Sequence, residues 1–300
     1  MLLIQVLRYV LRRFYSPELF FSQSEPPATN EQILSVRDSG PKVTIIIPTR
    51  DRVDLLKRCI GSVRSITLYA NYEVLVVNNG SVEPETLSYL RELNQIGITS
   101  IDFPGEFNFA AICNFATREA SGQVLCFLNN DALIVQPEWL DWLVSKALWV
   151  NAGVVGPVLL ENEHLISDAG IALGHRGIAG SMLRGQILSD PIVSGTLARD
   201  RPVSAISFAC AVVSKQKYLD VGGMDETFAV GLNDVDFGMR SLAEGWTNYV
   251  VSSSRVIHKG YGSRNRMTDF KGGFRAAKEV LRFLRKYRLF SFRDGFAVRG

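Results

Sequence analysis

The chain has 300 residues, of which 47% are apolar, 10% aromatic and 21% charged. This composition excludes a mainly disordered chain, because apolar side chains are plentiful and the net charge is only +3. No uncharged apolar run reaches the roughly 18 residues of a membrane span. The first 21 residues do not follow the order of a secretory signal either, because Arg8, Arg12 and Arg13 interrupt their apolar run.

The small net charge hides an uneven distribution along the chain. Residues 255–300 carry 13 basic and 3 acidic side chains, whereas residues 1–254 carry 20 basic and 27 acidic ones. The sequence therefore describes an acidic body with a basic tail.

The four cysteines are expected to be buried free thiols, because they show neither CxxC spacing nor a nearby histidine cluster. They are Cys59, Cys113, Cys126 and Cys210. Unpaired thiols fit a reducing cytoplasm.

Three regions follow one another along the chain. Residues 1–40 are expected to form an N-terminal amphipathic segment and a linker, since residues 22–41 are rich in Ser, Pro, Glu and Asn. Residues 41–264 are expected to form the main domain. Residues 265–300 are expected to form a basic amphipathic helix and tail.

Strand and helix patterns alternate at the start of the main domain. Short buried strands are predicted at 43–48, 72–77, 98–103 and 124–128, with helical spacing at 55–63, 87–93 and 109–120. This alternation predicts an α/β fold with a doubly wound, mostly parallel sheet. Further on, the patterns predict a helix from Pro137, strands at 153–160 and 204–214 and a helix at 235–243. Residues 167–196 are glycine-rich and are expected to form long loops over a site.

Polar residues follow three of the predicted strands. They are Thr49-Arg50-Asp51, Asn78 to Ser81, and Asn129-Asn130-Asp131. Ligands of such sheets bind beyond the carboxyl ends of the strands. Asp131 offers a hard oxygen ligand for Mg²⁺ or Mn²⁺, which would complete its shell with water and diphosphate oxygens. Ordinary turn chemistry accounts well for Asn79-Gly80, and Asp131 could instead cap a helix.

A second acidic cluster lies in residues 223–241. Asp234 and Asp236 stand at the start of a predicted helix, with Asp225 and Glu226 nearby. One acid could simply stabilise the helix N-terminus, but a carboxylate held near a reacting hydroxyl can serve as a general base. His258 follows an apolar strand and is either a structural histidine or a metal ligand that faces the oxygen ligands.

Six motifs in this order resemble the family 2 inverting glycosyltransferases of the GT-A fold, closest to the bacterial rhamnosyltransferase-like branch of surface polysaccharide assembly. They are the strand ending in Pro48-Thr49-Arg50, VVNNGS, the stretch from Asn108 to Gly122, FLNNDA, GGMDETF and NDVDFGMR. The resemblance covers roughly residues 41–264. It implies a Rossmann-like three-layer α/β/α architecture with a mixed, mostly parallel central sheet. It also implies metal-dependent, inverting transfer of a hexosyl or rhamnosyl group from a dTDP-, UDP- or GDP-sugar to a saccharide or lipid-linked acceptor.

The same resemblance implies residue roles. Asp234 would be the catalytic base, and Asp131 and His258 would hold Mg²⁺ or Mn²⁺. The residues implied to bind the nucleotide sugar are Thr49, Arg50, Asp51, Asn78, Asn114, Asn129, Asn130 and Asp131.

Three positions depart from the family pattern. Asn78 replaces an acid, Asn233 replaces the Glu that usually precedes the base, and His258-Lys259-Gly260-Tyr261 replaces His-His-Glu-Ser. These departures keep open a non-catalytic relative that binds a sugar nucleotide or a partner protein. A sugar nucleotidyltransferase needs a glycine-rich loop after the first strand, which this sequence lacks. A glycosidase would also use two carboxylates, but it needs no diphosphate cradle.

The basic tail has two interpretations. Phe274, Ala277, Leu281 and Leu284 fall near helical spacing among basic residues, and Phe283, Tyr287, Phe290 and Phe292 add aromatic side chains. Such a helix favours contact with an anionic membrane surface, and the alternative is a helix packed on its own acidic domain. No nucleic-acid partner is expected, because nothing else resembles a nucleic-acid module. The expected location is the cytoplasm, with peripheral contact at the inner face of the cell membrane as an option.

Overall fold

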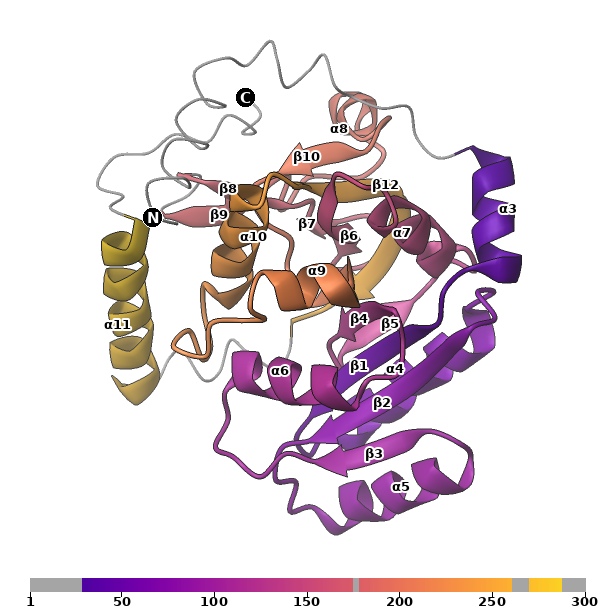
Figure 1. Ribbon diagram of the computed structural model, residues 1–300, viewed down its shortest axis with the longest axis vertical. Coiled ribbons are helices and arrows are strands. Elements are labelled where there is room, and N and C mark those ends of the chain that lie inside the picture. Colours follow the sequence, from indigo (N-terminus) through magenta and orange to yellow (C-terminus); the bar gives the residue numbers. More distant parts are fainter. Residues whose placement is uncertain (1–28, 175–177, 261–269, 288–300) are drawn as a thin grey trace.

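The computed structural model describes residues 29–174, 178–260 and 270–287. Within these ranges, a mixed sheet runs through the centre of the molecule in the order β10-β12-β6-β11-β4-β1-β2-β3 (Figure 1). Strands β5 and β7 pair with β12 and β6. The strands are β1 (Val43–Thr49), β2 (Tyr72–Asn78), β3 (Thr99–Asp102), β4 (Val124–Leu128), β5 (Ala132–Ile134), β6 (Ala152–Leu160), β7 (Ile166–Asp168), β10 (Arg201–Val203), β11 (Cys210–Ser214) and β12 (Thr247–His258).

Most strands of the sheet point the same way. Strands β4, β1, β2 and β3 pair in parallel, as do β6 and β12, while β11 is antiparallel to both of its neighbours. Ile45, Ile46 and Ile47 are fully buried, because a strand covered on both faces needs a continuous apolar run. The predicted mixed, mostly parallel α/β sheet is confirmed.

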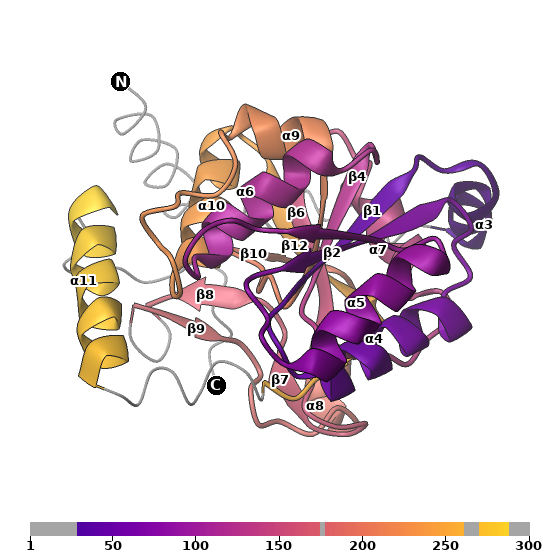
Figure 2. The same ribbon diagram turned by 90° about the horizontal axis from the view of Figure 1, so that it is seen from below.

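Helices cover both faces of the sheet, so the predicted three layers are confirmed (Figure 2). One apolar cluster joins the sheet to α4 (Val53–Ile66), α5 (Pro84–Gln95) and α7 (Trp139–Ala147). A second cluster joins the opposite face to α6 (Phe109–Glu119), α9 (Lys215–Asp220) and α10 (Asn233–Ala243). The four cysteines are buried and free, as predicted.

The prediction of a linker is wrong for residues 30–39. They form α3 (Asn30–Ser39), which lies against α7. Arg37 donates to the fully buried Asp141 at 2.9 Å, from Nε to Oδ1. A ten-residue helix has little stability of its own, so this contact supplies support that its weak apolar periodicity does not reveal.

Residues 167–196 are more regular than predicted. They contain the hairpin of β8 (Ile171–Leu173) and β9 (Ala179–Ser181) and the short helix α8 (Pro191–Thr196). Strands of three residues are too short to show a period, so the expectation of long loops is wrong here. The strand predicted at 204–214 is likewise shorter, since only Cys210–Ser214 is extended as β11.

Helix α11 (Phe270–Tyr287) stands outside the three layers, beside α10 (Figures 1 and 2). Its Phe283 and Tyr287 are buried in a third apolar cluster that includes Phe228 from the loop before α10. The interpretation of a helix packed on its own domain is confirmed. The predicted apolar face is wrong, because Ala277 and Leu281 are exposed.

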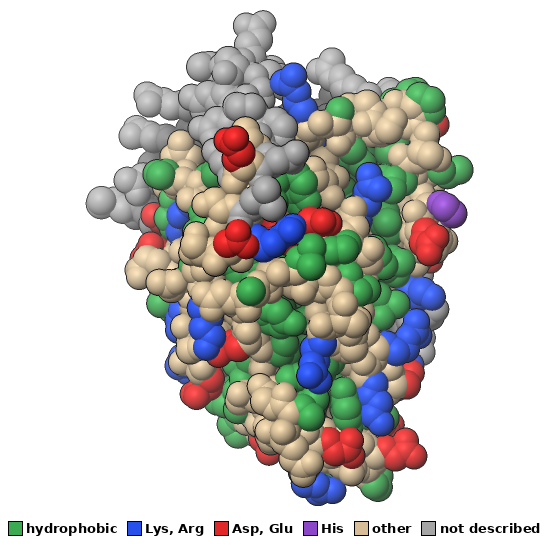
Figure 3. Space-filling view, turned by 90° about the vertical axis from the view of Figure 1, so that its right-hand side faces the viewer, with side chains coloured by type: hydrophobic (Ala, Val, Ile, Leu, Met, Phe, Trp, Pro, Cys, Tyr) green, Lys and Arg blue, Asp and Glu red, His purple; other side chains and the backbone are tan. Residues whose placement is uncertain are grey.

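No helix in the described part of the chain combines the length and the apolar character that crossing a membrane requires. On the face at the right of Figure 1, acidic and basic side chains are interspersed (Figure 3). The acidic excess of the body is therefore not concentrated on that face.

Candidate active site

The carboxyl ends of β1, β2 and β4 meet at one edge of the sheet, as predicted. Asn130 donates from Nδ2 to the Thr49 hydroxyl at 2.9 Å, and the N–H of Asn79 donates to the Thr49 carbonyl at 2.8 Å. Thr49 is buried and Arg50, the next residue, is exposed. The carboxyl ends of β1, β2 and β4 thus form one polar surface.

Asp51 joins the loops that follow β1 and β2. One oxygen of its carboxylate accepts the N–H groups of Val82 and Glu83 at 2.7 and 2.9 Å, and its own N–H donates to the Ser81 hydroxyl at 2.8 Å. Asp51 and Arg52 have φ values of 52° and 54°, which are uncommon for residues other than glycine. The carboxylate of Asp51 therefore stabilises a strained turn beside Thr49.

Asn78 is paired with an acid on the neighbouring strand. Its Nδ2 donates to Asp102 Oδ1 at 2.7 Å, and its Oδ1 accepts the N–H of Ser81 at 3.0 Å. An aspartate at position 78 would place two like charges in contact, which gives a physical reason for the amide found there. Sequence reasoning missed Asp102, although an exposed acid at the last position of a parallel strand was a usable signal.

Asp131 and His258 face each other. The register of β12 with β5 sets His258 opposite Ala132, and His258 Nε2 lies 3.2 Å from Asp131 Oδ1 and 3.2 Å from Asn129 Nδ2. Asp131 precedes a strand, so the alternative that it caps a helix is wrong. The predicted proximity of these two residues is confirmed.

This pair fits a divalent cation. A carboxylate oxygen and an imidazole nitrogen are ligands that Mn²⁺ accepts, and Mg²⁺ commonly keeps several waters beside one or two carboxylates. Within the described ranges, no three His, Cys, Asp or Glu side chains converge into a complete metal cage. Asp131 and His258 would therefore leave coordination positions for water and for a diphosphate.

Asp234 lies in the first turn of α10. The side chain of Asn233 accepts the N–H of Asp234 at 2.7 Å, and Asp234 Oδ1 accepts the N–H of Val235 at 2.8 Å. Burial raises the pKa of Asp234 to about 6, with the N–H of Val235 opposing the rise and the charge of Asp168 adding to it. A carboxylate in this range is a stronger proton acceptor than an ordinary aspartate.

Asp168, at the end of β7, is a site residue that sequence reasoning missed. It is only 7% exposed, and its Oδ1 accepts the N–H of Gly170 at 2.8 Å. Burial raises its pKa, whereas a hydrogen bond from Ser181 and the charge of His258 lower it. Asp168 thus interacts electrostatically with both His258 and Asp234. An acid within a short apolar run was the available signal.

Two further acids near Asp234 are held by cations. Lys286 Nζ lies 2.8 Å from Asp225 Oδ2 and 2.5 Å from Asp236 Oδ1, and Arg240 Nε lies 2.8 Å from Asp236 Oδ2. Although burial opposes it, hydrogen bonds from Lys286 and Thr227 lower the pKa of Asp225 to about 2. Asp225 and Asp236 therefore serve the packing of α11.

Asn114 contacts a loop rather than the strand ends. Its Nδ2 donates to the Met224 carbonyl and to Glu226 Oε1, both at 2.9 Å. Its Oδ1 accepts the Tyr218 hydroxyl at 2.7 Å. The predicted contact of Asn114 with a sugar nucleotide stays a prediction, and its contacts in the structure fix the loop ahead of Asp234.

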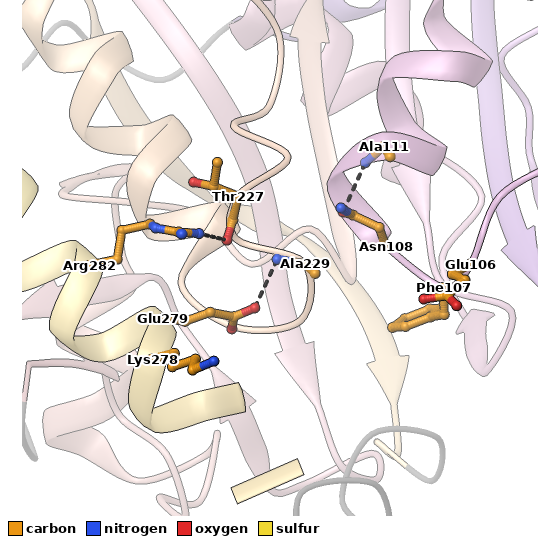
Figure 4. A pocket seen from close by; sticks show the side chains of 9 residues that line it. All are labelled: Glu106, Phe107, Asn108, Ala111, Thr227, Ala229, Lys278, Glu279 and Arg282. Atoms are coloured by element: carbon orange, nitrogen blue, oxygen red, sulfur yellow. Dashed lines mark hydrogen bonds between the residues drawn. The ribbon is translucent and has the colours of Figure 1, made fainter. Parts of the chain in front are cut away.

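A cleft of about 420 Å³ opens between the N-terminus of α6, the loop before α10 and α11 (Figure 4). It is lined by Glu106, Phe107, Asn108, Ala111, Thr227, Ala229, Lys278, Glu279 and Arg282. Arg282 donates to the Thr227 carbonyl at 2.7 Å, which draws α11 onto the loop. One wall of the cleft is therefore the segment that leads to Asp234.

Comparison with known proteins relates the sequence and the fold of this chain to glycosyltransferases. Residues 44–199 match the model of the family described as "Glycosyl transferase family 2". O-antigen biosynthesis protein RfbC of Myxococcus xanthus is 37% identical over 226 residues, which is 75% of this chain and 18% of RfbC. N-acetylglucosaminyl-diphospho-decaprenol L-rhamnosyltransferase of Mycobacterium tuberculosis (strain H37Rv) is 36% identical over 130 residues, 41% of this chain and 42% of that protein. The chain thus spans less than half the length of either relative.

The fold matches that of a solved GT-A glycosyltransferase. Mannosyltransferase PcManGT from Pyrobaculum calidifontis, in complex with GDP-Man and Mn²⁺, superposes with a TM-score of 0.61 at 16% identity. The superposition covers 98% of this chain and 77% of that one. At this identity the likeness concerns the fold.

Proposed function

This chain belongs to glycosyl transferase family 2, and we propose that it moves a sugar from a nucleoside diphosphate to an acceptor hydroxyl in surface polysaccharide assembly. The observation that carries this proposal is the contact of His258 with Asp131 and Asn129 just beyond the carboxyl end of β4, 3.2 Å in each case. It sets a candidate metal pair beside the polar strand ends. The hexosyl or rhamnosyl nature of the sugar and the dTDP, UDP or GDP carrier are part of the same proposal.

The donor would bind along the strand ends. Thr49, Asn78 and Asp102 would line the nucleoside side, while Asn129 and Asn130 would face the diphosphate. Mg²⁺ or Mn²⁺ held by Asp131 and His258 would act as a Lewis acid that stabilises charge on the departing diphosphate. The contacts between Thr49 and Asn130 and between Asn78 and Asp102 support this division, because they fix both groups before a ligand arrives.

Asp234 would be the general base. Its carboxylate would accept the proton of the acceptor hydroxyl while that oxygen bonds to the anomeric carbon. The bond from the anomeric carbon to the diphosphate breaks on the opposite face, so the configuration inverts. A pKa of about 6 leaves Asp234 mostly ionised at neutral pH and still able to take up a proton.

The acceptor would enter through the cleft beside α11. The Phe107 ring and the polar groups of Glu106 and Asn108 suit a saccharide, and Lys278 and Arg282 suit a phosphate group such as a lipid-linked acceptor carries. Exposed Lys278, Arg282 and Arg285 would also allow peripheral contact with an anionic membrane surface at the cytoplasmic face. The buried Phe283 and Tyr287 would take no part in that contact.

A donor panel tests the proposal. We expect one of the dTDP-, UDP- and GDP-sugars to raise the melting temperature in the presence of Mn²⁺ and to be hydrolysed slowly, with both effects lost in EDTA. Asp234→Asn should keep donor binding and lose transfer, whereas Asp131→Ala should weaken both. Binding without turnover by the wild type would instead favour a non-catalytic relative. Near wild-type transfer by both variants would refute the residue assignment.

A further inference from the structure

Three consecutive backbone amides point at one carboxylate of α11. Glu279 Oε1 accepts the N–H groups of Ala229 and Val230 at 2.9 and 3.1 Å, and its Oε2 accepts the N–H of Gly231 at 2.8 Å. Glu279 is only 4% exposed, and Figure 4 shows its carboxylate pointing from α11 toward Ala229. Hydrogen bonds to a charged acceptor are the strong ones. The side chain therefore holds this loop through three charge-assisted hydrogen bonds.

The held loop ends at a strained residue that precedes the base. Leu232 has φ = 60°, and a bulky side chain in this left-handed region is a genuine outlier. Such a conformation persists only where the surrounding structure over-determines it. Glu279 fixes the three residues before Leu232, and Asn233 fixes the N–H of Asp234 on its other side.

A glycine allows the carboxylate to come this close. A Cβ built on Gly231 would lie 3.3 Å from Glu279 Oε2, which is tighter than ordinary van der Waals contact. The small residue and the buried acid are therefore matched to each other, although they lie 48 positions apart in sequence.

Side chains other than Glu279 also hold α11 against the domain. Phe283 and Tyr287 are buried against the domain, Lys286 joins Asp225 to Asp236, and the Tyr287 hydroxyl donates to Asp236 Oδ1 at 2.6 Å. A buried carboxylate also carries a desolvation cost. Its three bonds to one loop indicate a task that the apolar contacts do not perform.

We propose that Glu279 is a positioning residue for sugar transfer: its carboxylate holds the amides of residues 229–231, fixes the bend at Leu232 and thereby sets the place of the Asp234 carboxylate. The proposal rests on the proposed function in that Asp234 is the base there. Glu279 itself touches no reacting atom.

Two variants and a matched control test the proposal in the full chain. Glu279→Ala removes both acceptor oxygens and with them all three hydrogen bonds. Glu279→Gln keeps the shape but replaces one oxygen by an NH₂ donor that opposes an N–H. Glu73→Gln is the control, because Glu73 Oε1 likewise accepts a backbone N–H, that of Ser121 at 2.9 Å, at the opposite end of β2 from Asn78.

The kinetic expectation separates positioning from mere stability. A misplacement of about 1 Å can cost roughly a hundredfold in rate, so kcat should fall by roughly ten- to a hundredfold in both Glu279 variants. The KM for the donor should stay within about twofold, because the proposed donor contacts lie on other elements. The acidic limb of the kcat profile should move to lower pH as the loop loosens and Asp234 gains water. Even where Glu73→Gln lowers the melting temperature by a comparable amount, it should leave both kcat and the acidic limb unchanged.

Amide exchange tests the hold without any activity. The N–H groups of residues 229–231 should exchange faster in Glu279→Gln than in the wild type, and at the wild-type rate in Glu73→Gln. In an NMR titration of Glu279→Gln, the carboxyl signal of Asp234 should titrate at lower pH than in the wild type. Unchanged amide exchange at residues 229–231 in Glu279→Gln overturns the proposal. So does a Glu279 variant with the kcat and the acidic limb of the wild type, or an equal loss of kcat in Glu73→Gln. A wild type that transfers no sugar defeats the proposed function alone, since exchange and titration still decide the role of Glu279.

Discussion

The candidate base owes its chemistry to its surroundings. Burial raises the pKa of Asp234 to about 6, and the negative charge of Asp168 contributes to the same shift. Asp225, only nine positions earlier, has its pKa lowered to about 2 because hydrogen bonds from Lys286 and Thr227 outweigh burial. Two aspartates of one short segment are thus prepared for different tasks, one to accept a proton and the other to stay charged in an ion pair.

The pH dependence of transfer follows from the state of Asp234. A general base must be ionised, so kcat should fall as pH drops through about 6 and Asp234 becomes protonated. Initial rates measured from pH 4.5 to 8 in a buffer series of constant ionic strength would show this limb. A limb near 4, the range of an ordinary aspartate, would contradict the pKa assigned to Asp234.

Asp168→Asn gives a second check on the same group. Removing the neighbouring negative charge should lower the pKa of Asp234, so the acidic limb should move to lower pH. Asp190→Asn is a suitable control, because Asp190 caps α8 at Ile192 and Val193 and an asparagine can still accept those hydrogen bonds. A limb that moves equally in both variants would argue against a specific effect of Asp168.

The amide at position 78 is expected to depend on its acidic partner. Asn78→Asp would set a carboxylate against Asp102 at the present 2.7 Å contact, so donor affinity and melting temperature should both decrease. The double variant Asn78→Asp with Asp102→Asn restores one donor and one acceptor, and it should recover most of the loss. Donor affinity by calorimetry, measured across this double-mutant cycle, would reveal the coupling. Additive losses would show that the two residues act separately.

At the scale of elements, α11 stabilises the segment that carries the base. Its side chains reach that segment at three places: Glu279 at residues 229–231, Arg282 at Thr227, and Lys286 at Asp225 and Asp236. The helix is therefore part of the candidate site, although it lies outside the three layers of the fold.

Lys286→Met should destabilise the protein. Asp236 is fully buried and would keep Arg240 and the Tyr287 hydroxyl, but it would lose one of its two cations. Hydrogen bonds to charged groups contribute about 1.5–3 kcal/mol, so the free energy of unfolding in urea should fall by about that amount. Lys57→Met, at an exposed position of α4, should change it by less than about 0.5 kcal/mol. Equal stabilities for the two variants would refute this role of Lys286.

The sequence predicts the elements whose apolar period is long enough to be read. Strands β1, β2 and β4 and helices α4, α6 and α10 lie within three residues of their predicted positions. Helix α3 and the hairpin of β8 and β9 were missed, because α3 depends on contact with α7 and strands of three residues show no period. The buried face of α11 was misassigned, since only the tertiary fold decides that Phe283 rather than Leu281 meets the domain.

For the candidate site, the sequence predicts the residues that stand in motifs, but not the residues outside the motifs that act on them. Asp131, His258 and Asp234 stood in recognisable motifs, and the structure places the first two in contact. Asp168 and Glu279 lie far along the chain from the groups they influence. The sheet topology decides which residues meet across such long separations in sequence, and no local sequence pattern records that topology.

At the scale of the whole molecule, the candidate site combines distant parts of the chain. Residues 49–131 supply the strand ends, Asp168 lies on β7, and residues 225–287 supply the candidate base, His258 and helix α11. The sheet joins them, because β11 lies between β4 and β6 and β12 pairs with β5 beside Asp131. Donor and acceptor sides should therefore be separable by mutation.

Removing residues 265–300 tests that separation. The shortened chain would lose the burial of Phe283 and Tyr287, at about 1.5–3 kcal/mol for a large apolar side chain, and would uncover Phe228. We expect a lower melting temperature, loss of transfer and retention of donor binding, measured by calorimetry at low temperature. Transfer at the wild-type rate by the shortened chain would show that α11 has no part in the reaction.

The position of α11 late in the chain has a consequence for biosynthesis. A ribosome completes β1, β2 and the turn that carries Asp131 well before it makes Glu279 and Lys286, and nascent chains fold from the N-terminus as they emerge. A growing chain could thus acquire its nucleotide-facing edge while the bend at Leu232 still lacks its three-amide anchor. Sugar transfer would begin only once α11 has left the exit tunnel, so an unfinished chain would bind donor without consuming it.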